Sequence, residues 1–270
     1  MKFYEGCTAL ITGASSGLGA EFSKQLAPYV RHLILVARRL ERLERIKSDL
    51  EAGHKNLTVH VYGADLGSEE QRVALANWLP TQNLSVDFLI NNAGLGDRGP
   101  FESSDWNRVK ALLDVNAIAL THLTHLLLPS MTLRGRAAIL NVSSVAGFFP
   151  LPNTAVYAAT KAYVTSLSEA LAIELGPRGI TVTAVCPGPI ETEFHAAARR
   201  EGDEVRPSHA ETMPKFVVTP EEAVRVSLLA VARGRPRVIP GTLLWVLVTV
   251  AAMVPFFVVR AVLRAVRNEL

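Results

Sequence analysis

The sequence has little cysteine and no cluster with the character of a metal site. Only two cysteines occur in 270 residues, Cys7 and Cys186, each inside an apolar run. Buried thiols in a reducing compartment explain them better than a disulfide or a metal pair. His122 and His125 are three residues apart, but no carboxylate or further cysteine completes a ligand set with them. We therefore expect no metal.

Strong charge of one sign is also missing. The formal net charge is +3, and no basic run with interleaved aromatic residues accompanies it, so we expect no nucleic-acid partner. Residues 1–6 lead directly into an apolar run and carry no secretory signal, which predicts a cytoplasmic protein. Hydrophobic residues make up 49% and charged residues 20%, enough for a sizeable core.

Short apolar runs alternate with segments of helical spacing along most of the chain. The strand-like runs are Ala9–Thr12, Leu33–Ala37, Thr58–Tyr62, Phe88–Asn91, Ala138–Val142, Thr181–Cys186 and Val238–Ile239. The helical segments are Ala20–Leu26, Leu40–Leu50, Glu69–Leu79, Val109–Leu128, Tyr163–Leu175 and Glu221–Ala232. This alternation predicts an α/β fold with one doubly wound parallel sheet of about seven strands and helices on both faces. We expect it to span residues 1–241 as one domain.

Two stretches depart from the alternation. Residues 189–217 mix charge and proline with little periodicity, which predicts a mobile loop. After Gly241 an uncharged run extends from Leu243 to Val259, interrupted by Pro255 and followed by three arginines. About 17 residues is the lower limit for crossing a bilayer. The 242–270 extension is therefore open to three interpretations: attachment to a membrane surface through residues 243–267, packing on the protein or a dimer, or spanning.

A glycine-rich turn joins the first predicted strand to the first helix, within Thr12–Gly19. Glycines here let the backbone approach a pyrophosphate, while amide groups at the helix start hold its charge. A purely structural turn is the alternative. The expected dinucleotide contacts are Gly13, Ser15, Ser16, Gly17, Leu18 and Gly19.

The second predicted strand ends in Arg38 and Arg39, and no acidic residue follows until Glu41. An acidic residue would favour NAD by binding the ribose 2′-hydroxyl, whereas arginine suits a 2′-phosphate. The alternative is two solvated arginines at a helix start. Beside the glycine turn, the pair predicts NADP(H).

Tyr157 and Lys161 are four residues apart in a helical pattern, so both side chains lie on one face. A nearby ammonium favours phenolate, which predicts a lowered pKa for Tyr157 and a role as acid/base. Ser143 and Ser144 follow the fifth predicted strand at the end where ligands of open parallel sheets bind. A hydroxyl there can stabilise charge on a substrate oxygen. Asn116, inside a predicted helix, is either a satisfied core amide or a functional group.

In this order, these residues resemble the short-chain dehydrogenase/reductase family over nearly all of residues 7–240. The matching motifs are T-G-x-x-x-G-x-G at Thr12–Gly19, Asp65, N-N-A-G at Asn91–Gly94, Asn116, S-S-x-A-G at Ser143–Gly147, Y-x-x-x-K at Tyr157–Lys161 and P-G-x-x-x-T at Pro187–Thr192. The resemblance implies a Rossmann-type sheet and a homodimer or homotetramer. Relatives that prefer NADP place their 2′-phosphate ligand at the position of Arg38. They often also carry a basic residue where this chain has Ser16, so the preference here rests on Arg38 and Arg39.

The resemblance also implies a role for each residue. Tyr157 is the expected proton donor, Lys161 lowers its pKa and holds the nicotinamide ribose, and Ser144 rather than Ser143 orients the substrate. Asn116 is expected to hold a proton-relaying water. The remaining expected cofactor contacts are Asp65, Leu66, Asn92, Ala93, Gly94, Pro187, Gly188, Ile190 and Thr192.

Together these predictions describe an NADP(H)-dependent oxidoreductase for a carbonyl or alcohol substrate. Phe148, Phe149, Pro150, Leu151 and Phe194 suggest an apolar pocket wall and hence a lipophilic ketone, aldehyde or acyl carbonyl, unless the first two phenylalanines merely pack beneath the loop. A catalytically idle NADP-binding sensor or membrane-associated scaffold is the alternative function.

Overall fold

A single parallel sheet forms the centre of the molecule. The computed structural model describes residues 1–132, 137–190, 192–194, 198, 200 and 214–265. Its strands are β1 (Thr8–Thr12), β2 (His32–Ala37), β3 (Thr58–Gly63), β4 (Phe88–Asn91), β5 (Ala137–Val142), β6 (Ile180–Val185) and β7 (Arg237–Val238). All pairs are parallel, in the order β3-β2-β1-β4-β5-β6-β7. The order reverses direction next to β1, and the predicted doubly wound sheet is confirmed.

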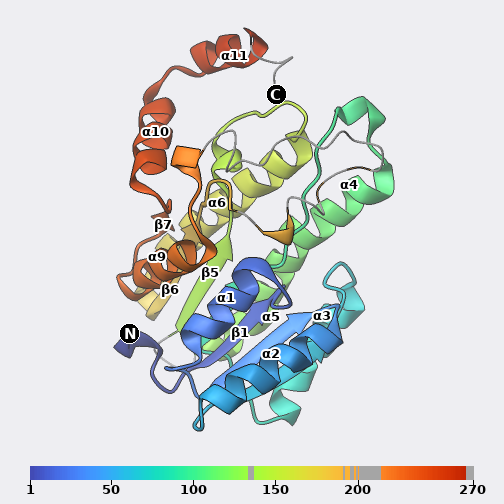
Figure 1. Ribbon diagram of the computed structural model, residues 1–270, viewed down its shortest axis with the longest axis vertical. Coiled ribbons are helices and arrows are strands. Elements are labelled where there is room, and N and C mark those ends of the chain that lie inside the picture. The colour runs from blue at the N-terminus through green and yellow to red at the C-terminus, as the bar shows by residue number, and fades with distance from the viewer. Residues whose placement is uncertain (133–136, 191, 195–197, 199, 201–213, 266–270) are drawn as a thin grey trace.

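Helices cover both faces of the sheet (Figure 1). They are α1 (Gly17–Leu26), α2 (Leu40–Gly53), α3 (Glu69–Thr81), α4 (Trp106–Leu113), α5 (Leu120–Thr132), α6 (Ala155–Leu175) and α9 (Pro220–Ala232). Phe22 of α1, Leu43 of α2 and Leu228 of α9 belong to one core cluster. Leu75 of α3 and Leu123 of α5 belong to the other. The strands β1, β2, β4 and β5 are buried throughout except at His32, as expected for a sheet covered twice.

The long helix predicted over Val109–Leu128 is interrupted. Between α4 and α5 the residues Asp114–Ala119 form a π-helix, labelled η3, with Asn116 buried at its centre. Such wide turns are rare and often lie at functional sites. The periodicity of apolar residues did not predict this interruption, since the apolar positions on both sides of it remain compatible with one helix.

The apolar extension forms two helices rather than one. They are α10 (Thr242–Met253) and α11 (Phe256–Ala265), at the top of the view in Figure 1. Val254 is extended, with φ −74° and ψ 132°, because Pro255 disfavours a helical conformation in the residue before it. Thr242–Met253 and Phe257–Ala265 are apolar enough together to cross a membrane, but they are bent by 116°.

By length and composition, Trp106–Met131 is also apolar enough to cross a membrane. It comprises α4, η3 and α5, and Leu112, Leu123 and Leu127 on it are buried in the protein. Its apolar character is therefore that of a helix packed on the sheet. The loop predicted over 189–217 lies mostly outside the described residues.

Candidate active site

The glycine turn brings the chain close to its neighbour after β4. Gly13 has φ +65°, and a Cβ atom there would lie 2.8 Å from Ala93 Cα. A Cβ on Gly19 would lie 2.6 Å from the Asn92 amide nitrogen, which itself donates to Thr12 O at 2.9 Å. Side chains at either glycine would fill the space between the two segments. The start of α1 therefore keeps its amide groups accessible, an arrangement that fits a dinucleotide phosphate.

Arg39, rather than Arg38, reaches the glycine turn. Its Nη2 donates to Ser15 Oγ at 3.1 Å and to Ser16 Oγ at 2.9 Å. Arg38 is exposed, whereas Arg39 is partly covered. Ser16 stands where NADP-preferring relatives often carry a basic residue. Its hydroxyl accepts a hydrogen bond from the Arg39 guanidinium, which follows β2. The resemblance singled out Arg38 as the 2′-phosphate ligand, whereas the arginine that contacts the glycine turn is Arg39.

The ends of β3 and β4 contribute the remaining residues expected around the adenosine. Asp65 is exposed after β3, and its Oδ1 accepts a hydrogen bond from Gly67 N at 3.0 Å. Leu66 beside it is buried. Asn92 N and Ala93 N both donate to Thr12 Oγ1, at 2.9 and 3.0 Å. These contacts hold the turns after β1 and β4 side by side, next to the glycine turn.

The residues expected to be catalytic come together at the carboxyl ends of β4 and β5. Lys161 is buried in α6, and its Nζ donates to Val142 O at 2.8 Å and lies 5.7 Å from the Tyr157 ring centroid. A Cβ on Gly94 would be 3.6 Å from Lys161 Nζ, so the turn after β4 ends beside the ammonium. Ser144 Oγ donates to Pro187 O at 3.4 Å. The tyrosine, lysine and serine thus face the same edge of the sheet as the glycine turn.

The two neighbouring serines have different environments. Ser143 is buried and its Oγ donates to Lys161 O at 2.8 Å, so it fastens α6 to β5. Ser144 Oγ is partly exposed, and its hydrogen bond opposes the rise in the pKa of Tyr157. This difference agrees with Ser144 as the residue that faces a substrate.

Burial controls the ionisation of both catalytic groups. It raises the pKa of Tyr157 to about 12, partly opposed by the Ser144 hydrogen bond. It lowers the pKa of Lys161 to about 8, partly opposed by the neighbouring Cys186. In the protein without cofactor, the expectation that Lys161 lowers the Tyr157 pKa is wrong. The free-energy cost of burying a phenolate exceeds its attraction to the Lys161 ammonium, which lies 5.7 Å from the ring centroid. At neutral pH the tyrosine is a protonated donor.

The Asn116 side chain is fully occupied by the protein. Its Oδ1 accepts from Leu95 N at 2.7 Å, and its Nδ2 donates to Leu95 O at 2.9 Å and to Thr160 Oγ1 at 3.2 Å. These bonds tie the π-helix to the turn after β4 and to α6. Of the two alternatives for Asn116, the satisfied core amide is therefore observed, and this amide contacts α6. Its role in proton relay remains a prediction.

The turn after β6 closes the expected nicotinamide end. Pro187 O accepts from Val145 N at 3.0 Å, and Ile190 is buried. A Cβ on Gly188 would contact the Leu244 side chain of α10. A Cβ on Gly17 would lie 3.5 Å from Thr192, so this residue reaches back to the glycine turn.

Aromatic residues surround the site unequally. Phe194 lies 5.8 Å from the Tyr157 ring, between centroids. Phe148 and Phe149, together with Phe216, pack against the cluster of Ala184, Cys186, Ile239, Leu244 and Val248. Of the two alternatives for Phe148 and Phe149, packing against the protein is therefore observed, now with α10 as part of the surface that they contact.

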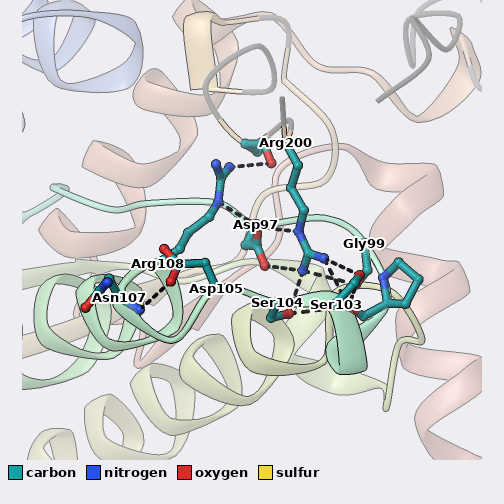
Figure 2. A network of polar contacts seen from close by, with 10 residues as sticks. Asp97, Gly99, Ser103, Ser104, Asp105, Asn107, Arg108 and Arg200 are labelled. Atoms are coloured by element: carbon teal, nitrogen blue, oxygen red, sulfur yellow. Dashed lines mark hydrogen bonds and ion pairs between the residues drawn. The ribbon is translucent and has the colours of Figure 1, made fainter. Parts of the chain in front are cut away.

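An ion-pair network fastens Arg200 beside the turn after β4 (Figure 2). Arg200 Nη2 lies 2.8 Å from Asp97 Oδ2, and Arg108 Nε lies 2.7 Å from Asp97 Oδ1. Arg200 also donates to Ser104 Oγ at 2.7 Å. Asp97 and Arg200 are only 10% and 15% exposed, so this contact is shielded from water. No sequence pattern predicted this contact, since the partners are 103 residues apart.

Comparison with known proteins agrees with this geometry. A family model described as short chain dehydrogenase matches residues 7–203. The chain belongs to the short-chain dehydrogenase family. It is accordingly an oxidoreductase that acts on a CH–OH or C=O group with a nicotinamide dinucleotide, and the predicted family and class of enzyme are confirmed.

Three relatives place this short-chain dehydrogenase more closely. A sulfoacetaldehyde reductase from Chromohalobacter salexigens is 37% identical over 199 residues, 72% of this chain and 76% of the relative. A short-chain dehydrogenase from Sphingobium yanoikuyae, solved in complex with NADPH, has a TM-score of 0.77 at 34% identity, over 87% of this chain and 88% of that one. A bulky-bulky ketone specific alcohol dehydrogenase from Comamonas testosteroni has a TM-score of 0.74 at 32% identity, over 91% of both chains. The prediction of NADP(H) agrees with the first of these two structures.

Proposed function

We propose that the protein is an NADP(H)-dependent carbonyl reductase or alcohol dehydrogenase with Asn116, Ser144, Tyr157 and Lys161 as its catalytic set. The observation that carries the proposal is the meeting of Tyr157, Lys161 and Ser144 at the sheet edge that also bears the glycine turn. Arg39 on Ser15 and Ser16 supports a 2′-phosphate at the same edge. The bound dinucleotide would supply or accept the hydride.

In the direction of reduction, Tyr157 and Ser144 both act on the carbonyl oxygen of the substrate. The Tyr157 hydroxyl, held protonated by burial, gives its proton to the carbonyl oxygen as charge develops there. Ser144 Oγ donates a hydrogen bond to the same oxygen. Positioning supplies about 7–11 kcal/mol of the barrier reduction, and general acid catalysis a further ~10²–10⁴-fold in rate.

The substrate that we propose is a lipophilic ketone, aldehyde or acyl carbonyl. Phe194 beside the Tyr157 ring supports an apolar wall at the reacting end of the site. The Comamonas alcohol dehydrogenase, whose description specifies bulky-bulky ketones, is consistent with such a wall. Oxidation of NADPH against a panel of steroid, retinoid, fatty-acyl and small aromatic carbonyls tests this, and turnover only of small polar carbonyls would contradict it.

Replacement of Tyr157 by phenylalanine tests the enzyme against the alternative of an idle NADP-binding sensor or scaffold. The variant should retain its dissociation constant for NADPH and lose at least ~10²-fold in kcat, because the proton donor is gone. Tyr163→Phe on the same helix is the control, since its hydroxyl bonds to Thr121 Oγ1 away from Lys161. Wild-type protein that binds NADPH without turning over any carbonyl would support the sensor, and full activity of Tyr157→Phe would remove Tyr157 from the mechanism.

We also propose that residues 242–270 form a separate C-terminal extension that attaches the enzyme to a membrane surface on the cytoplasmic side. Leu244 and Val248 of α10 face inward and are buried, whereas Trp245, Leu247 and Val250 are about half exposed. An exposed apolar surface of this kind favours a lipid interface or a partner over water. Arg260 and Arg264 on α11 are positioned to meet anionic headgroups, and the 116° bend at Pro255 disfavours a single straight crossing.

Self-association as a homodimer or homotetramer is proposed for the outer side of α5 and α6. Ile173 is 79% exposed, and Ile118 and Tyr163 are 49% and 43% exposed around a hollow of about 530 Å³ that His122 and His125 also line. Burial of these side chains between copies would remove apolar area from water. Light scattering should report a multiple of the 29.3 kDa chain mass.

A further inference from the structure

The arginine that holds the glycine turn also holds a carboxylate. Arg39 Nη1 lies 3.3 Å from Glu193 Oε2, and Arg42 Nη1 donates to both Glu193 oxygens, at 3.0 and 2.9 Å. Arg39 is at the end of β2, Arg42 is on the first turn of α2, and Glu193 follows β6. Two cations from one part of the fold therefore converge on a single anion that is 154 residues away from Arg39.

This place is the one that a 2′-phosphate requires. The same Arg39 guanidinium contacts Ser15 and Ser16 in the glycine turn, so an anion beside it lies at the adenosine end of the cofactor site. A carboxylate accepts the same forked arginine hydrogen bonds as a phosphate. Hydrogen bonds from Arg42 and then Arg39 hold the pKa of Glu193 below its usual value, and the carboxylate is therefore charged at neutral pH.

We propose that Glu193 occupies the position of the cofactor's 2′-phosphate in the cofactor-free enzyme, so that the two anions compete for Arg39 and Arg42. The inference rests on the proposed NADP(H) cofactor and adds Arg42 to the groups that recognise the phosphate. NAD(H), which lacks that phosphate, leaves Glu193 in place.

Displacement of Glu193 would also move its neighbours Thr192 and Phe194, and Phe194 lies beside Tyr157. Thr192 lies next to it in the chain and beside Gly17, and the Phe194 ring contacts that of Tyr157 at an interplanar angle of 50°. The contacts of Glu193 are exposed, with the three side chains 41% to 59% accessible, so they are weak enough for a ligand to replace. Arg200, in contrast, is held by the shielded Asp97 pair (Figure 2) and stays fastened. The 2′-phosphate is thereby coupled to the residues beside the catalytic tyrosine.

The experiment compares 2′,5′-ADP with 5′-ADP by calorimetry on the full-length protein. For Glu193→Gln we expect the dissociation constant for 2′,5′-ADP to fall by roughly threefold to tenfold, and that for 5′-ADP to change by less than about twofold. Glu222→Gln is the matched control, because it removes the same charge from an exposed pair with Arg225 on α9. A Glu193→Gln variant that binds 2′,5′-ADP as wild type does, or more weakly, overturns the proposal.

A second background separates competition from a general effect of charge. In Arg42→Gln, which lacks two of the three arginine contacts to Glu193, the further change Glu193→Gln should gain less than about twofold for 2′,5′-ADP. An undiminished gain would mean that only the long-range field of the carboxylate matters and would also overturn the proposal. If wild type binds 2′,5′-ADP no better than 5′-ADP, the NADP preference itself fails; if the preference exists and Glu193→Gln leaves it unchanged, only the competition fails.

Discussion

The charge of the buried Lys161 makes the free energy of unfolding depend on pH. Burial lowers its pKa to about 8, against 10.5 for an exposed lysine. The unfolded chain then binds more protons than the folded chain between these two values, and the contribution of Lys161 to stability rises as pH rises through that window. Below pH 8 the folded protein bears the full cost of an ammonium away from water.

We therefore expect wild type to gain stability relative to Lys161→Met between pH 7 and pH 10. Urea unfolding at several pH values measures the difference, which should change by up to ~3 kcal/mol over the window. Lys24→Met is the control, because the Lys24 side chain is 72% exposed and pays no such cost. A difference between Lys161→Met and wild type that is constant with pH would contradict the assigned ionisation.

At the scale of single residues, the sequence predicted which residues meet at the site but not how their side chains are oriented. Motif order placed Tyr157, Lys161 and Ser144 together because the carboxyl ends of parallel strands share one edge. The inward turn of Arg39 and the pairing of Glu193 with Arg42 depend on side-chain packing between distant segments. The shift of the Tyr157 pKa was mistaken in sign, since a pair of neighbouring residues does not reveal how deeply the phenol is buried.

The two sides of helix α10 differ in burial. Leu244 is 6% exposed and packs against the cluster around Cys186, whereas Leu247 on the same helix is 47% exposed. Truncation of a buried leucine to alanine costs about 2–5 kcal/mol. Leu244→Ala should accordingly lower Tm by roughly 4 °C or more, while Leu247→Ala leaves it nearly unchanged. Equal melting temperatures of the two variants in scanning calorimetry would show that α10 does not pack on the domain.

Most strand and helix positions were predictable to within a few residues from apolar periodicity, as β4 and α9 show, but α6 begins at Ala155, well before the predicted start at Tyr163. The π-helix at Asp114–Ala119 was not predictable, because Leu112, Asn116, Ala119 and Leu123 are buried at spacings of three and four, as in an uninterrupted helix. Pro255 did mark the break between α10 and α11, since its effect on the preceding residue is local. The 116° angle that follows depends on tertiary packing and has no local signal.

For the whole molecule, the balance between solution and membrane is set by the exposed apolar surface of α10 and α11. Phe257 is 73% exposed, so Phe257→Glu should reduce co-flotation of the full-length protein with vesicles of anionic phospholipid by severalfold. Trp106→Glu, which alters a 67% exposed side chain on α4, should leave flotation unchanged. Wild-type protein that stays entirely in the soluble fraction without detergent would remove the basis for membrane attachment.

The contact between Gly188 and Leu244 makes the sizes of these two residues interdependent. A methyl group at position 188 has no room while the Leu244 side chain keeps its place, so Gly188→Ala alone should displace that side chain or distort the turn after β6. Gly188→Ala combined with Leu244→Ala restores the space and should recover part of the loss. Helix α10, part of an extension that the sequence left open to three interpretations, is in this way a sterically matched neighbour of the turn after β6, and we expect a substitution in one to be compensated in the other.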